Sequence, residues 1–175
     1  GNLNPPGHTF PTDHIYLAYE PIDEPLELRA PGDLRIFVIR KSEYVISSFR
    51  QGVQDFGIDL TDEAETVRAN LSHVNALAPQ IEAQLGSGDC ETYQAGDETI
   101  ESCQFQVAID VLPGDALGTL TGESSWNLDF GLYDSDQSNG LDPSRYYEQT
   151  ITTACPLDYF EPGIQETLYS LLGQR

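Results

Sequence analysis

The chain has 175 residues, 39% of them hydrophobic, which is enough to bury one core and excludes disorder throughout. Its 29 acidic residues against eight basic ones give a formal net charge of -21, which repels phosphate backbones and anionic lipid surfaces and excludes nucleic acid as a favoured partner. No apolar run approaches the ~18 residues of a membrane-spanning helix, so membrane insertion is not expected. We attribute the acidity to solubility rather than to an acidic binding face.

Most segments between the turns have the composition or the alternation of β-strands. An extended arm is expected over residues 1–12, and strands over 14–19, 25–46 in two pieces broken at Pro31-Gly32, 55–61, 65–77, 103–112 and 126–134, with a short strand among the glycines of 113–122. Short helices are expected over 78–86 and in the C-terminal stretches PSRYYEQ and PGIQETLYSLLG.

The strands are many and short, and the helices are few. The sequence therefore predicts a mostly β protein with a single-domain antiparallel β sandwich or barrel-like core over residues 13–134. The remaining residues, 135–175, are expected to form a C-terminal extension whose short helices pack on the same domain.

The cysteines bear on the compartment. Cys90 and Cys103 flank a polar, glycine-containing stretch, which favours a hairpin or loop closed by a disulfide over two buried thiols. Such a bond would stabilise the fold by about 3 kcal/mol in the chain-entropy model and would indicate an oxidising compartment. The sequence suggests no partner for Cys155.

Several common catalytic motifs are absent from the sequence. GESSW is not the G-x-S-x-G turn of serine hydrolases, and a single lysine without a Gly-Lys-Ser/Thr loop argues against nucleotide hydrolysis. The stretch over 134–145 begins like a calcium loop, but its glycine falls one residue late and Arg145 stands where the closing glutamate belongs. We therefore favour an ordinary turn rich in aspartate and asparagine.

The three histidines are better candidates for a site. His8 and His14 bracket Asp13 just before the first expected strand, and His73 lies in LSHVNALAP. A lone histidine is usually an ordinary surface or core residue, but these lie at the ends of expected strands.

A third segment, WNLDFGLYD, places two polar residues on one face of a strand. Asn127 and Asp129 alternate with Leu128 and Phe130, so the polar pair points to one side of the sheet and the apolar pair to the other. A strand can direct two such side chains into one cleft.

The order of these segments resembles the lysostaphin-type (LytM-like) zinc metallopeptidases, β-rich endopeptidases that cut peptide cross-links of bacterial peptidoglycan. That family has His-x-x-x-Asp before a strand, an Ala-Pro hairpin entry, a lone histidine, a glycine-rich turn and a closing His-x-His-Phe strand. The similar stretches, within residues 7–134, are GHTFPTDHIYL, LRAPGDLRIFVI, LSHVNALAP and LPGDALGTLTGESSWNLDFGLYD.

The chain departs from this pattern at the positions that carry the chemistry. The closing His-x-His falls on Asn127 and Asp129, and His8 and Asp13 stand five apart where the family has four. By the resemblance, His8, Asp13 and Asp129 would hold zinc or another divalent cation, and a site with no cofactor is equally open. His73 matches the remaining catalytic histidine. Asn127 cannot replace its counterpart as a general base, a loss that costs about 10²–10⁴-fold in rate.

We favour a catalytically degenerate metallopeptidase-like protein. It would act outside the cytoplasm, periplasmic or secreted, as a binding or regulatory module for peptidoglycan or another peptide, with or without a bound metal. One alternative is an active metal-dependent endopeptidase with an altered ligand set. The other is a structural β domain whose candidate residues lie scattered over the surface. The oligomeric state is left open.

Overall fold

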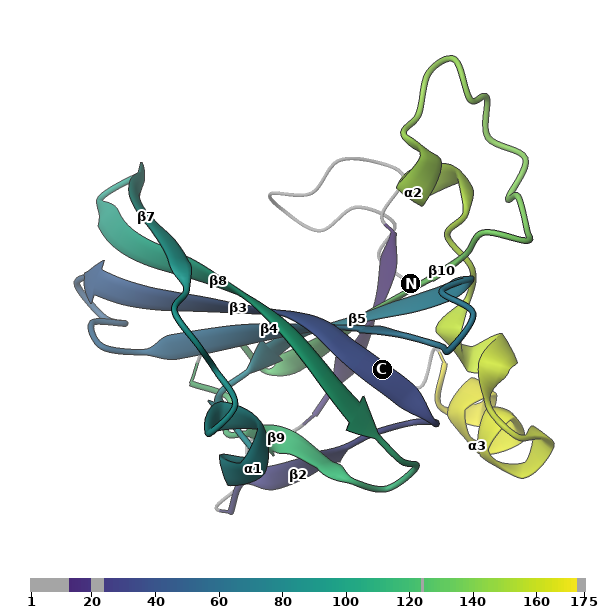
Figure 1. Ribbon diagram of the computed structural model, residues 1–175, viewed down its shortest axis with the longest axis horizontal. Helices are drawn as coiled ribbons and strands as arrows, with labels where there is room; N and C mark the ends of the chain where they lie inside the picture. Colours follow the sequence, from purple (N-terminus) through teal and green to yellow (C-terminus); the bar gives the residue numbers. More distant parts are fainter. Residues whose placement is uncertain (1–12, 20–23, 124, 173–175) are drawn as a thin grey trace.

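The computed structural model describes residues 13–19, 24–123 and 125–172, and the expected N-terminal arm lies outside these ranges. Its main feature is a seven-stranded antiparallel sheet (Figure 1). In spatial order the strands are β1 (His14–Ala18), β10 (Asn127–Asp134), β5 (Val67–Val74), β4 (Gln54–Thr61), β3 (Leu34–Ile46), β8 (Glu98–Val111) and β7 (Asp89–Ala95). Among the described strands the sheet has two edges, β1 and β7, so it does not close into a barrel.

A second, smaller sheet packs against one face of the first. It contains β2 (Leu26–Arg29), β9 (Ala116–Leu120) and β6 (Ala76–Leu77), and it lies together with the short helix α1 (Pro79–Glu82) (Figure 1). Apolar side chains from both sheets and from α1 form one buried cluster, which includes Ile36, Ile39, Ile58, Leu60, Leu71, Leu77, Ile81, Leu117, Leu128 and Phe130. The protein is therefore a mostly β, single-domain structure with two layers of antiparallel sheet, as the sequence predicted.

The C-terminal segment contains three short helical elements. They are α2 (Glu148–Ile151), a 3₁₀ turn (Pro156–Tyr159) and α3 (Pro162–Leu171). Phe160 packs edge-on against Phe130 of β10, and the backbone of Thr153 pairs with that of Tyr133. These contacts join the extension to the sheet beside β10. The described residues include no helix that is long and apolar enough to cross a membrane.

Three elements differ from the sequence prediction. The stretch PSRYYEQ, expected to be helical, is a turn through Tyr146, and α2 begins only at Glu148. The helix expected over 78–86 is a single turn, because its next backbone hydrogen bonds, from Gln84 to Ile81 and from Leu85 to Glu82, are of the tighter 3₁₀ kind. Strand β7 was expected only as one arm of the hairpin or loop between Cys90 and Cys103, since all seven of its residues are exposed and it has no apolar alternation to reveal it.

Two local expectations are confirmed. Cys90 and Cys103 form a disulfide between neighbouring positions of β7 and β8. In the calcium-like stretch, one carboxylate oxygen of Asp134 accepts a hydrogen bond from the backbone of Asp136, and the other accepts from the side chains of Gln137 and Tyr159. Because both carboxylate oxygens of Asp134 accept hydrogen bonds from groups of the protein itself, the stretch forms a turn held by its aspartate side chain.

The other face of the seven-stranded sheet is polar in its central strands. Alternation places Asp59 of β4, Asn70 of β5 and Asp129 of β10 on this face, while the residues between them enter the core. Asn70 donates to Asp59, and Asp59 in turn accepts two hydrogen bonds from Arg40 of β3. The polar face is where the predicted site residues meet.

Candidate functional site

A β-bulge at the end of β5 turns His73 onto the polar face. In the pairing of β4 with β5, Ile58 lies opposite Leu71 but Phe56 lies opposite Val74, so β5 contains one extra residue. His73 has a φ of 71°, in the left-handed region that a non-glycine residue rarely adopts. Strict alternation would direct His73 into the core, whereas the bulge leaves Leu71 and Val74 inside and His73 outside. Such backbone strain is usually retained where it positions a functional group.

Asp129 is the centre of the site. Its Oδ2 lies 3.3 Å from Nε2 of His73 and 3.5 Å from Nε2 of His14. Its Oδ1 is buried and has no hydrogen-bond partner within the described residues. The whole residue is only 8% exposed. One carboxylate on β10 therefore faces two imidazoles, one from β1 and one from β5.

Each imidazole is held from its other side by a second carboxylate. Nδ1 of His73 lies 2.7 Å from Oδ2 of Asp55, at the start of β4, and Nδ1 of His14 lies 3.0 Å from Oδ1 of Asp13. The result is a continuous line of alternating acids and imidazoles, which we call the histidine–carboxylate row. Its members are Asp55, His73, Asp129, His14 and Asp13.

Two tyrosines fix the β1 end of the row. The hydroxyl of Tyr133 donates to Oδ2 of Asp13 at 3.0 Å, and the hydroxyl of Tyr16 lies 3.2 Å from Nε2 of His14. Tyr133 reaches Asp13 across Gly131, where an added Cβ would lie 2.9 Å from the tyrosine oxygen. The glycine on β10 thus leaves the space through which the tyrosine crosses.

The row favours charged imidazoles. The hydrogen bonds of His73 to Asp129 and, as the second cause, to Asp55 raise the pKa of His73 to about 10, against the opposing effect of burial. The hydrogen bond to Asp13 raises the pKa of His14, and the same bond is the main cause that lowers the pKa of Asp13. His73 is therefore an imidazolium at neutral pH, and both of its nitrogens act as hydrogen-bond donors.

The structure brings together four residues that the sequence singled out from distant segments. They are Asp13, His14, His73 and Asp129. His8 lies outside the described residues. Sequence reasoning missed Asp55, although the alternation of DFGIDLT places it on the same strand face as Asp59.

Of the metal ligands expected from the resemblance, the two within the described residues, Asp13 and Asp129, belong to no group of three potential ligands with closely spaced donor atoms. Asp13 directs one oxygen to His14 and the other to Tyr133, so His14 stands between it and Asp129. Among the described residues, one group of three potential ligands has all its donor atoms within 4.8 Å of one another, namely Cys90, Glu101 and Cys103. Its two sulfurs are joined to each other.

The two imidazoles with Asp129 do not fit a preformed zinc site either. The donor atoms of these three residues do not all lie within 4.8 Å of one another. Zinc–ligand bonds of about 2.0–2.1 Å require donor atoms that lie much closer together than that. A cation bound by all three would require the rings to move toward each other.

Fold and site together define a class: a two-layer antiparallel β protein with a histidine–carboxylate row on the polar face of its larger sheet. Comparisons with models of known protein families, with curated proteins and with solved structures found no match.

Proposed function

We propose that this chain is a degenerate relative of the lysostaphin-type metallopeptidases that binds a peptide ligand, cell-wall peptide first among the candidates, without cleaving it. The observation that carries the proposal is that Asp129, at a metal-binding position of the family's closing strand, forms ion pairs within the protein. Where the family pattern has two imidazoles, this chain has Asn127 and Asp129, and Asp129 is engaged by His14 and His73 in internal ion pairs. The disulfide is consistent with a role outside the cytoplasm.

The acid–base chemistry supports binding over hydrolysis. Asn127 has no titratable group, and a histidine whose pKa is about 10 already holds its proton at neutral pH and cannot take one from water. The carboxylates of the row are occupied by imidazoles on one or both sides. The row thus contains strong hydrogen-bond donors and acceptors, while neither Asn127 nor the protonated His73 can act as a general base.

The row is also accessible. The side chains of His73 and Asp13, on opposite sides of Asp129, are 32% and 35% exposed. Imidazolium donors and carboxylate acceptors are the groups that pair with the carbonyl, amide and charged groups of a peptide. Their clustering favours this proposal over a structural domain with scattered polar residues.

The experiment combines three measurements on the full chain: metal content, digestion of purified peptidoglycan, and co-sedimentation with insoluble peptidoglycan. We expect no digestion, and co-sedimentation that weakens in His73→Asn, since asparagine tolerates the left-handed backbone but does not carry the charge. Arg145→Gln, in the C-terminal loop, is the matched control. Stoichiometric zinc together with cleavage that is lost in His73→Asn would reject the proposal.

One observation favours the active-enzyme alternative. Both imidazoles have Nδ1 on a carboxylate and Nε2 toward Asp129, which is how metal-binding histidines are commonly held by outer carboxylates. This alternative requires zinc or another divalent cation to bind at one equivalent and Asp129→Asn to abolish that binding. The measurement is calorimetric titration of the chelator-treated protein with Zn²⁺, Mn²⁺ or Co²⁺. The absence of saturable binding of these ions would exclude the alternative.

A further inference from the structure

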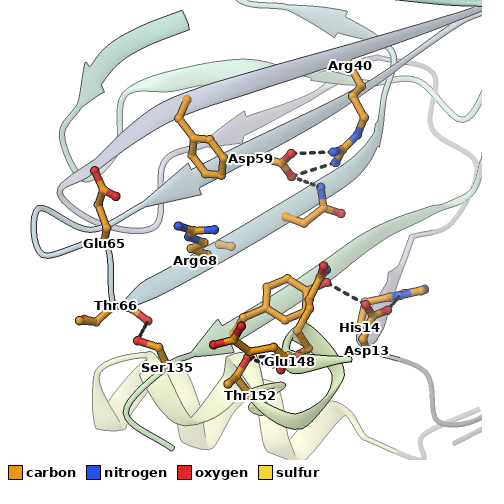
Figure 2. Close-up of a pocket in the computed structure, with 15 residues that line it drawn as sticks. Asp13, His14, Arg40, Asp59, Glu65, Thr66, Arg68, Ser135, Glu148 and Thr152 are labelled. Carbon is orange, nitrogen blue, oxygen red and sulfur yellow. Dashed lines mark hydrogen bonds and ion pairs between the residues drawn. The ribbon is translucent and has the colours of Figure 1, made fainter. Parts of the chain in front are cut away.

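A cavity of about 670 Å³ adjoins the β1 end of the row and is lined in part by Asp13 and His14. The polar faces of β3, β4, β5 and β10 form one side, and α2 with the turn between β4 and β5 borders it (Figure 2). Its volume lies within the range of about 300–1,000 Å³ typical of sites for small ligands. Its charged lining residues are Asp13, His14, Arg40, Asp59, Glu65, Arg68 and Glu148.

Arg68 is the unusual member of this lining. Five other described cations have a carboxylate within 4 Å, namely Arg29, Arg35, Arg40, Lys41 and Arg50. Within the described ranges, the two arginines without such a partner are Arg68, in the cavity, and Arg145, in an exposed loop. The chain has 29 acidic residues, and two glutamates line this cavity. A guanidinium that is nevertheless without a carboxylate partner among the described residues is therefore unusual.

The guanidinium is positioned by an aromatic ring. Its central carbon lies 5.6 Å from the centroid of the Phe37 ring, within the range of a cation–π contact. Arg68 is exposed, so its N–H groups remain accessible from the cavity. A planar guanidinium held on a ring presents its N–H groups in the geometry that pairs with a carboxylate through two hydrogen bonds. Arg40 differs, because Asp59 already accepts both of its hydrogen bonds.

The surrounding acids restrict the ligand. Asp59, Glu65 and Glu148 line the same cavity, so a phosphate or another multiply charged anion would meet repulsion that one arginine does not offset. A ligand that carries a single carboxylate and is otherwise neutral or positively charged would be attracted to Arg68 and would meet less repulsion from these acids. We propose that this cavity binds the carboxylate of such a ligand through Arg68. The source of the carboxylate is either the C-terminus of a short peptide or a small organic acid.

Asp13 and His14 of the row also line the cavity, but the proposal rests on Arg68, which forms no ion pair with a row member among the described residues. Carboxylate binding there needs neither a metal nor acid–base chemistry of the row. Failure of the two ideas is distinguishable. Loss of peptidoglycan binding in His73→Asn with unchanged carboxylate binding would leave this inference intact, and the reverse result would leave the proposed function intact.

The test is an NMR titration of ¹⁵N-labelled protein, at low ionic strength, with four probes: trialanine, trialanine amide, acetate and inorganic phosphate. We expect saturable shifts with trialanine at amides around the cavity, at least tenfold weaker binding of the amide, and no saturable binding of phosphate. Equal binding of acetate would identify a small acid as sufficient, whereas weaker acetate binding would identify the peptide C-terminus.

Variants assign the effect to the guanidinium. Arg68→Gln should weaken trialanine binding at least tenfold, Arg68→Lys should weaken it less, and Arg145→Gln should leave it unchanged. Melting temperatures of all variants show whether the cavity is still folded. Equal affinity for trialanine and its amide, no saturable binding of either carboxylate probe, or undiminished binding by a folded Arg68→Gln protein would each overturn the proposal.

Discussion

The pH dependence of stability gives a direct test of the row. His73 has an ordinary pKa of 6.5 and a pKa of about 10 in the folded protein. Because folding raises this pKa, the ion pairs of His73 contribute their full stability below pH 6.5, and the contribution is lost as the pH rises toward 10. Stability that depends on His73 should therefore fall through the alkaline range.

The magnitude follows from the two pKa values. Their difference corresponds to about 5 kcal/mol at about 1.4 kcal/mol for each pH unit, as an upper bound. The His73 side chain is 32% exposed, and solvent screening of a partly exposed ion pair reduces the contribution to about 2 kcal/mol. This amount is a substantial fraction of the 5–15 kcal/mol typical of a folded domain, so it is measurable.

The assay is urea unfolding of the wild type and of His73→Asn at intervals from pH 6 to pH 10, with a chelator present. Cys155→Ser in both proteins prevents thiol exchange at alkaline pH. Titration of groups remote from the row cancels in the difference between the two free energies of unfolding, which should shrink by about 2 kcal/mol from pH 6 to pH 10. A difference that stays constant over this range would refute the reasoning, because it would mean that Asp55 and Asp129 do not hold the proton on His73.

The remaining predictions concern single contacts. Cys90→Ser should lower the free energy of unfolding by about 3 kcal/mol, measured in urea, because it opens a loop of 13 residues; a loss below 1 kcal/mol would contradict the entropic estimate. Gly131→Ala should lower the free energy of unfolding by about 1–3 kcal/mol and displace Tyr133, because the new Cβ would lie 2.9 Å from the tyrosine hydroxyl. The control Gly57→Ala, whose new Cβ would have contacts of 3.4 Å or more, should lower it less. Equal melting temperatures of the two variants would argue against the close approach at Gly131. Asp129→Asn should lower the pKa of His73, because it removes the largest cause of the upward shift. NMR titration of the His73 ring protons measures this pKa. An unchanged value would mean that Asp129 is not the centre of the site.

If the proposed relationship to the metallopeptidases is correct, Asp129 replaces an imidazole and adds a negative charge beside His14 and His73, which both pair with it. A site rich in fixed charges would then stay suited to polar recognition after the loss of its base. Under that proposal, we expect selection to act on binding at this face rather than on turnover.

The sequence determined most of the secondary structure. Alternation in WNLDFGLYD correctly placed Leu128 and Phe130 in the core and Asp129 on the opposite face, because a strand directs successive side chains to opposite sides. The break at Pro31-Gly32 correctly separated β2 from β3. Local patterns of this kind depend only on neighbours along the chain.

Tertiary structure decided the site. Asp55 joins the row only because β4 pairs with β5, and His14 separates Asp13 from Asp129 only because β1 pairs with β10. His73 reaches the polar face through a bulge that reverses the alternation of its strand, and no period in the sequence reveals an inserted residue. The sequence thus contained the acids and imidazoles, while the order in which they contact one another was fixed by strand pairing between distant segments.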